Sequence, residues 1–180
     1  MRTVLAGFAG GILMFVWASI AHVALPLGQI GVNALPNESQ SIAAIASAMG
    51  ENGGLFIFPD MRPGKPMANK KGTGPSGLLV YQPHGSFEMA PSQLATEFAK
   101  EVVEVFIAAT LLSLTALQGY AARVGFVTLV GFVAAIATNI SYWNWYAFPL
   151  NYTLSYGLIQ LVGYFAAGLA IAWVVPTRSP

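Results

Sequence analysis

The distribution of charged residues constrains this chain more than any other feature of its sequence. Residues 124–177 contain no Asp, Glu, Lys or Arg, and the first 25 residues carry only Arg2. Charged residues make up 8% of the chain, whereas soluble globular domains carry about 25%. The bilayer core excludes charge, and this chain has too little polar material to cover a water-soluble fold. The sequence therefore predicts a multi-spanning membrane protein.

Four segments are apolar and long enough to be expected as transmembrane helices. Pro26 ends the first segment, and Pro91 suits the first turn of the helix that contains the second. A tight turn is expected at 119–123, between the second and third spans. The predicted boundaries are 1–25, 91–122, 123–148 and 149–180. The predicted fold class is an all-α integral membrane protein with four transmembrane helices and one large loop at 26–90.

The first segment has an alternative interpretation as a secretory signal peptide, because Arg2 precedes an apolar stretch that ends in small residues. That stretch is longer than a usual signal-peptide core, so we predict a span that is not cleaved. With a cytoplasmic N-terminus, Arg2, Arg123 and Arg178 all lie on the cytoplasmic side, as the positive-inside rule favours. The predicted location is the bacterial inner membrane, multi-pass, with both termini inside and the large loop in the periplasm.

The large loop contains three segments with a regular pattern. Asn37, followed three residues later by Gln40, predicts a helix capped by Asn37, and the apolar residues that follow predict a short amphipathic helix ending at Gly50. Residues 54–59 and 77–83 are apolar runs bounded by Gly and Pro, which predict two strands that can pair as a hairpin. An isolated hairpin is marginally stable in water, so these elements are expected to need something to pack on.

Polar side chains are concentrated toward the outer end of the predicted bundle. Spans one and three run outward and spans two and four run inward, so residues late in the first pair share a depth with residues early in the second. The candidate ligand-binding residues are His22, Glu101, Glu104, Asn139, Asn144, Trp143 and Tyr146. Ionisable residues at membrane depth are functional candidates. A Glu–His pair can bind a metal, hydrogen-bond a quinone headgroup or pass a proton; the alternative is a satisfied interfacial pair.

Two further patterns concern the surfaces of the spans. Residues 142–148 are dense in Trp and Tyr, which is typical of an interfacial belt, with a flat wall for a pigment, quinone or lipid tail as the alternative. Small residues spaced four apart allow helices to approach closely, within the chain or toward a neighbouring subunit. The expected helix-packing positions are Gly7, Gly11, Gly163 and Ala167.

Composition and spacing exclude or weaken several functions. The absence of cysteine excludes disulfides, thiolate metal sites, iron–sulfur clusters and cysteine nucleophiles. A net charge of +1 gives no reason to expect nucleic acid as a partner. No spacing typical of a metal or catalytic site is present, so we assign no metal ligand and no catalytic residue and do not expect an enzyme. The identity of any cofactor stays open.

Three stretches, residues 15–26, 35–38 and 55–59, resemble a group of small uncharacterised four-span bacterial membrane proteins. The shared features are a Trp near the end of the first span, here Trp17, and a Leu-Pro exit before an outer loop with a short helix. The resemblance covers mainly the first sixty residues. It implies a bacterial inner-membrane setting and implies no activity and no site residues.

Three functions fit these observations. The first is an accessory or structural subunit of a larger bacterial membrane complex, respiratory or photosynthetic. The second is a small-molecule binding protein, for a quinone, lipid or metal, with a polar site at the outer mouth of the bundle. The third is an oligomeric transporter or channel, although four spans rarely enclose a pathway. The expected partners are the lipid bilayer and other membrane protein subunits.

Overall fold

The structure is a computed structural model that describes residues 2–60, 74–85 and 89–177. The described chain is mostly helical, with one two-stranded sheet. It divides into two compact units, one made from the described residues of 1–32 and 89–180 and the other from those of 33–88. The first unit is a helical bundle and holds the candidate site.

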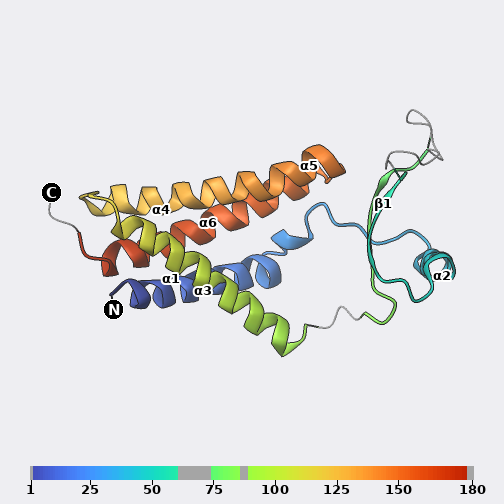
Figure 1. Cartoon of the computed structure of the whole chain (residues 1–180), viewed down its shortest axis with the longest axis horizontal. Coiled ribbons are helices and arrows are strands. Elements are labelled where there is room, and N and C mark those ends of the chain that lie inside the picture. Colours follow the sequence, from blue (N-terminus) through green and yellow to red (C-terminus); the bar gives the residue numbers. More distant parts are fainter. Residues whose placement is uncertain (1, 61–73, 86–88, 178–180) are drawn as a thin grey trace. The chain divides into compact units, whose positions relative to one another are not determined.

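The bundle contains four long helical segments that lie side by side (Figure 1). One of them ends in a π-helical turn and another contains one between two α-helices; in such a turn the helix is locally wider than an α-helix. The segments are α1 (Arg2–Ser19) with η1 (Ile20–Ala24), α3 (Pro91–Ser113), α4 (Tyr120–Ala135) with η3 (Ile136–Ile140) and α5 (Ser141–Tyr146), and α6 (Leu150–Val174). A short 3-10 turn, η2 (Leu27–Gln29), follows η1. Helix α1 packs against α3 and α6, while α4 packs mainly against α6.

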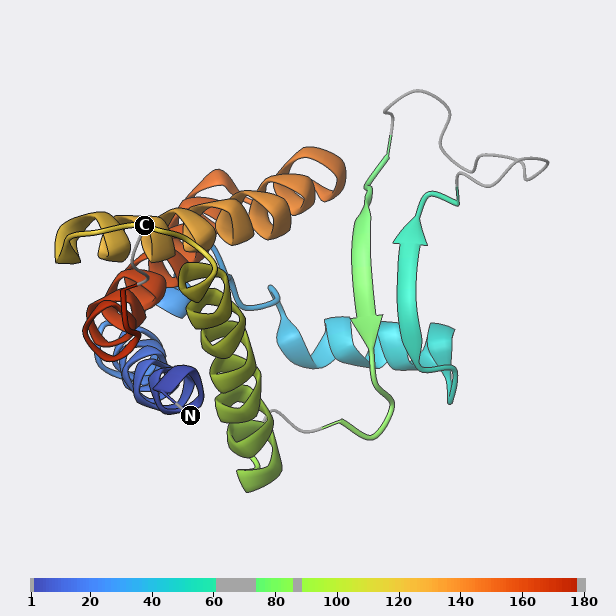
Figure 2. The same ribbon diagram turned by 60° about the vertical axis from the view of Figure 1, so that its left-hand side comes forward.

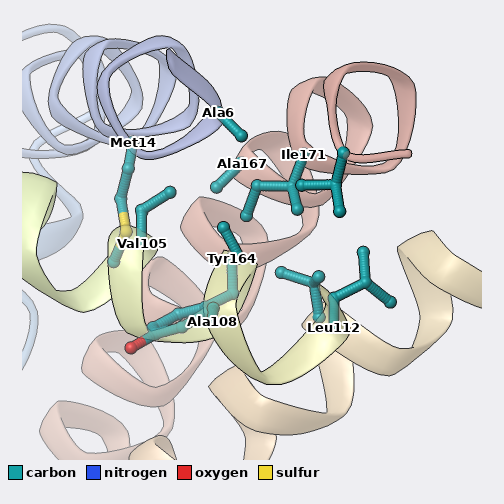
Figure 3. Close-up of a cluster of buried hydrophobic side chains, with 11 residues drawn as sticks. Ala6, Met14, Val105, Ala108, Leu112, Tyr164, Ala167 and Ile171 are labelled. Atoms are coloured by element: carbon teal, nitrogen blue, oxygen red, sulfur yellow. The ribbon is translucent and has the colours of Figure 1, made fainter. Parts of the chain in front are cut away.

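Small side chains allow these helices to pack closely. The core residues labelled in Figure 3 come from three helices: Ala6 and Met14 from α1, Val105, Ala108 and Leu112 from α3, and Tyr164, Ala167 and Ile171 from α6. Gly7 and Gly11 bring α1 against α3, since a Cβ at Gly11 would lie 2.8 Å from Cγ2 of Val102. Gly163 lies against Met14 and Trp17. All four of the small residues singled out in the sequence therefore lie at contacts within the chain.

Three helical segments of the described chain are long and apolar enough to span a membrane: Arg2–Ala24, Tyr120–Tyr146 and Leu150–Val174. The fourth predicted span, α3, is not among them. At 23 residues α3 is long enough, but its residues 97–104 include four charged ones, Glu97, Lys100, Glu101 and Glu104. The helical fold is confirmed, and the crossing of the membrane by α3 stays a prediction. Arg178, assigned to the cytoplasmic side, lies outside the described residues.

The turn between the second and third predicted spans lies earlier than expected. Helix α3 ends at Ser113 and α4 begins at Tyr120, so the prediction of a helix over 91–122 with a turn at 119–123 is wrong. The Thr115 hydroxyl donates to the carbonyl of Leu112 and accepts from the amide of Leu117, which gives the backbone an alternative to the helix. Arg123 is consequently inside α4.

The second unit contains α2 (Glu38–Met49) and an antiparallel hairpin of β1 (Gly54–Phe58) and β2 (Gly77–Tyr81), with Phe56 opposite Leu79 (Figure 2). The predicted helix and strand pairing are confirmed. None of the described residues between 33 and 88 is buried. The hairpin exposes apolar side chains, with Leu55 68% and Val80 71% exposed.

The predicted capping role of Asn37 is wrong. Asn37 has a left-handed backbone conformation with φ of +46°, which Asn tolerates better than most residues, and its side chain makes no capping hydrogen bond. The helix start is held instead by the Asn37 carbonyl, which accepts from the amides of Gln40 and Ser41. The Ser41 hydroxyl donates to the carbonyl of Pro36.

Candidate functional site

A cavity of about 220 Å³ lies within the helical bundle, between α1, α3, α6 and the π-helical turns η1 and η3. It lies where α1 and α4 end and where α3 and α6 begin, because these helices alternate in direction. Its polar lining comes from η1, α3, η3 and α6. The polar side chains are His22, Glu97, Lys100, Glu101, Glu104, Asn139 and Gln160.

Glu101 is the most deeply buried of these polar residues. Its side chain lies on the inner face of α3, and only 2% of the residue is exposed. Its Oε2 atom has no hydrogen-bond partner within the described residues. A buried carboxyl oxygen without a partner costs free energy, since it has lost its water and gained no donor in return. Glu101 is therefore the group in the bundle that most requires a donor.

The other charged groups of α3 have partners. The ammonium group of Lys100 donates to Oε1 of Glu97 at 2.6 Å, one helical turn apart, and both side chains are about half exposed. Glu104 is half-buried and accepts a long hydrogen bond, 3.4 Å, from the hydroxyl of Tyr164 on α6. Lys100 is thus the one cation among the cavity-lining residues, and it is paired with the outermost carboxylate rather than with Glu101.

His22 is held by its own helix and by the turn that follows. Its Nδ1 donates to the carbonyl of Ala18 at 2.9 Å. A Cβ at Gly28 would lie 2.2 Å from the ring, so only glycine fits there. The ring also makes an edge contact with Tyr156, with centroids 5.8 Å apart. No hydrogen bond joins His22 to Glu101 or Glu104 in the described chain, so the predicted Glu–His pair is not formed.

Asn139 uses the same local arrangement as His22. Its Nδ2 donates to the carbonyl of Ala135, four residues earlier, at 3.0 Å. In both places a side chain donates to a carbonyl that accepts from a backbone amide in a regular α-helix, and in both places a π-turn is present. Such turns occur frequently at functional sites. Here they carry the two uncharged polar side chains of α1 and α4 that reach the cavity.

Aromatic and apolar side chains form the rest of the wall. Trp17 lines the cavity and is fixed by its Nε1, which donates to the carbonyl of Ile159 at 2.8 Å. Tyr156 lines it from α6 and stacks on Tyr152 at 4.3 Å between ring centroids. The hydroxyl of Tyr156 donates to the carbonyl of Gly28 at 3.3 Å, which ties α6 to the turn after α1. Hydrogen bonds to backbone carbonyls therefore hold both rings in place.

The structure brings together four of the seven residues proposed from the sequence: His22, Glu101, Glu104 and Asn139. The other three, Trp143, Asn144 and Tyr146, lie on α5 with exposed side chains and do not line this cavity. The aromatic wall predicted there is provided instead by Trp17 and Tyr156. Helical spacing placed α5 at the right depth, but it did not show which face of α5 turns inward.

The sequence places Glu97 on one helix face with Glu101 and Glu104, although it was not selected as a candidate, and sequence reasoning missed Lys100 and Gln160 as members of this site. Gln160 lies one helical turn after Tyr156, and this spacing would have indicated a shared face. Within the described residues no three His, Asp or Glu groups are placed so that they could hold a metal ion. The side chains that line the cavity offer hydrogen-bond donors and acceptors, charge and aromatic rings.

A second buried charged residue lies at the opposite end of the bundle. Arg123 of α4 is 6% exposed, and its guanidinium donates to the carbonyl of Val175, just after α6. The last carbonyls of a helix lack intrahelical partners, and a cation near a helix C-terminus is favoured by the helix dipole. Arg123 is therefore a structural clamp between α4 and the end of α6.

Comparison of the chain with protein-family models, with curated proteins and with solved structures finds no match.

Proposed function

We propose that this chain is a four-span membrane protein that binds a small molecule in the cavity at the outer end of its bundle. The observation that carries the proposal is the buried Glu101, which lines the cavity and whose Oε2 has no hydrogen-bond donor among the described residues. A ligand that donates to this oxygen stabilises the bundle, and the fixed rings of Trp17 and Tyr156 give it a preformed wall.

The membrane setting is supported by the outer surface of the bundle. Large apolar side chains on its outside are widely exposed, among them Leu5, Leu129, Val133 and Trp173, which suits contact with lipid. In the proposed topology α3 also crosses the inner membrane, so both termini and the α3–α4 turn are cytoplasmic. Its charged residues then lie against the cavity and the outer interface, where such residues are tolerated.

The ligand-binding proposal is tested by filling the cavity. Ala18 lines the cavity, whereas Ala99 of α3 is exposed and lines none of the described cavities. Native membranes containing wild-type, Ala18→Phe or Ala99→Phe protein are extracted with a styrene–maleic acid polymer. The small molecules released on denaturation are then identified by mass spectrometry. Wild-type and Ala99→Phe protein should release a molecule that Ala18→Phe protein lacks. The same molecules from all three would refute the proposal.

The topology is tested with single cysteines, because the natural chain has none. Ser39→Cys lies in α2, and Ala116→Cys lies in the exposed α3–α4 turn. In intact spheroplasts an impermeant maleimide should label Cys at 39 and should label Cys at 116 only after lysis. Equal labelling of both before lysis would place the two ends of α3 on one side and overturn the four-span topology.

A second candidate function, an accessory subunit of a larger membrane complex, is favoured by the unit of residues 33–88. This unit buries none of its described residues, and Leu55 and Val80 stand opposite each other as an exposed apolar pair on the hairpin. Replacing both with Ser should shift the protein to a smaller species on native gels, while Gln40→Ser should not. Wild-type protein that always migrates as a single chain would contradict this function.

A further inference from the structure

The charges around the cavity do not balance. Three carboxyl groups and one ammonium group line it, and Lys100 is engaged with the half-exposed Glu97. Glu101 and Glu104 are left without a cationic side chain as hydrogen-bond partner in the described bundle. Two carboxyl groups one turn apart on α3, both withdrawn from water, favour a ligand with positive charge.

The geometry of the acceptors narrows the kind of cation. Among the residues that the structure describes, none donates to Oε2 of Glu101, and Glu104 receives only a long hydrogen bond from Tyr164. These oxygens need N–H or O–H groups, which a quaternary ammonium does not offer. A bare metal ion is disfavoured by the absence of three suitably placed ligating groups in the described residues. A primary ammonium supplies three donors as well as the charge.

The rest of the cavity suits the carbon part of such a ligand. Met14, Trp17 and Ile159 give one apolar side, and a cation close to an aromatic face gains further attraction. The volume of about 220 Å³ exceeds the roughly 150 Å³ of a cavity known to hold benzene. A small organic amine therefore fits within this volume.

We infer that the cavity binds a primary amine, with its ammonium group between Glu101 and Glu104 and its carbon part against Trp17. The inference rests on the proposed ligand-binding function and names its ligand class. Two sources carry this chemistry, a soluble amine and the headgroup of an aminophospholipid. A neighbouring hollow shares Ala18, His22 and Glu97 with the cavity and is otherwise largely apolar, so a lipid chain has a place beside the headgroup.

The experiment measures binding of tritiated phenethylamine to the full chain in nanodiscs of phosphatidylglycerol, a lipid without an amine. Saturable binding at one site per chain is expected. Unlabelled ethanolamine should compete, while neutral 2-phenylethanol should not, and benzyltrimethylammonium should bind at least about tenfold more weakly because it donates no hydrogen bond. Absence of saturable binding, or equal competition by the neutral alcohol, would overturn the inference.

Substitutions of single glutamates test which carboxyl groups bind the ammonium group. Glu101→Gln should lower the affinity at least about tenfold, and Glu104→Gln should lower it by a smaller factor, because Glu104 already has a partner. Glu38→Gln, on the exposed α2, is the matched control and should bind as wild type does. Should Glu101→Gln fail to fold, Glu104→Gln still decides. Unchanged affinity in a folded Glu101→Gln or Glu104→Gln variant would contradict the inference.

Adding phosphatidylethanolamine to the nanodiscs separates the two sources. If the natural ligand is the headgroup of an aminophospholipid, the added phosphatidylethanolamine should reduce phenethylamine binding. If the natural ligand is a soluble amine, phenethylamine binding should not change. Both results are consistent with the amine site measured in phosphatidylglycerol. The cavity-filling test separates this inference from the proposed function. A neutral or anionic molecule lost only from Ala18→Phe protein would refute the amine and preserve ligand binding, whereas no difference between variants would refute ligand binding itself.

Discussion

The two ends of the helical bundle each bury one charged residue, and they treat it in opposite ways. Arg123, at the end where α4 begins, is 6% exposed and donates to the carbonyl of Val175. Glu101, toward the end where α3 begins, is 2% exposed and has an oxygen with no partner in the described chain. Burial alone therefore does not identify a binding residue. The state of its hydrogen bonds separates a structural clamp from a candidate site.

The backbone also differs between the two ends of the bundle. At the Arg123 end, α3 and α4 are joined by six residues, 114–119, whose polar side chains bond to nearby backbone groups. At the Glu101 end, α1 and α4 widen into π-turns that present His22 and Asn139 to the cavity. At the Arg123 end the polar side chains form hydrogen bonds with nearby backbone groups. At the Glu101 end polar side chains line a cavity between the helices.

The largest expected effect on stability is at the Arg123 end of the bundle, where the buried charge has a hydrogen-bond partner. Arg123→Met keeps an unbranched side chain and removes the donor to Val175, so the free energy of unfolding in detergent should fall by about 1.5–3 kcal/mol, the usual value for a hydrogen bond to a charged group. Unfolding is followed by circular dichroism as denaturing detergent is added. Arg2→Met, at an exposed position, should unfold as wild type does. Equal stability of all three proteins would remove the contrast between the ends.

The next effect tests the packing that holds α4 between the two ends. A Cβ at Gly131 would lie 2.4 Å from Cβ of Tyr164, so Gly131→Ala must move α4 away from α6 and should cost about 1–3 kcal/mol. Gly125 on the same helix has nothing within 4 Å of such a Cβ. Gly125→Ala should be neutral or stabilise by up to about 1 kcal/mol, because Ala favours the helix. The same unfolding assay measures both, and a reversed order would show that α4 and α6 are packed differently.

Hydrophobic pattern predicted the helices and strands because it depends on local sequence. The apolar runs gave α1, α4 and α6, and the Gly and Pro residues around 54–59 and 77–83 gave the hairpin. The end of α3 was missed since Thr115 stops the helix through side-chain hydrogen bonds inside an otherwise apolar run. The π-turns were also missed, because the hydrophobic pattern does not show where a helix widens.

The depth of the candidate site followed from the alternation of helix direction, which brought His22, Glu101, Glu104 and Asn139 to one cavity. Its walls did not follow from the sequence. Whether Trp17 or Trp143 faces inward depends on the rotation of each helix about its axis, and that rotation is set by close contacts such as Gly163 against Trp17. The density of aromatic residues indicated a depth along the bundle, but it did not indicate which aromatic side chains face the cavity.

The smallest expected effect on stability is at the Glu101 end of the bundle. Whether the change there stabilises or destabilises the protein decides whether the two ends differ. Glu101→Gln keeps the shape of the side chain and removes the charge from a buried oxygen without a donor, so unfolding of ligand-free protein should change by less than about 1 kcal/mol or become harder. Glu97→Gln, which breaks the half-exposed pair with Lys100, should cost no more than about 1 kcal/mol. The two variants are compared with Arg123→Met in the same detergent titration. A loss at Glu101→Gln as large as that at Arg123→Met would mean that the carboxyl is satisfied within the protein, and the bundle would then have two structural ends and no binding end.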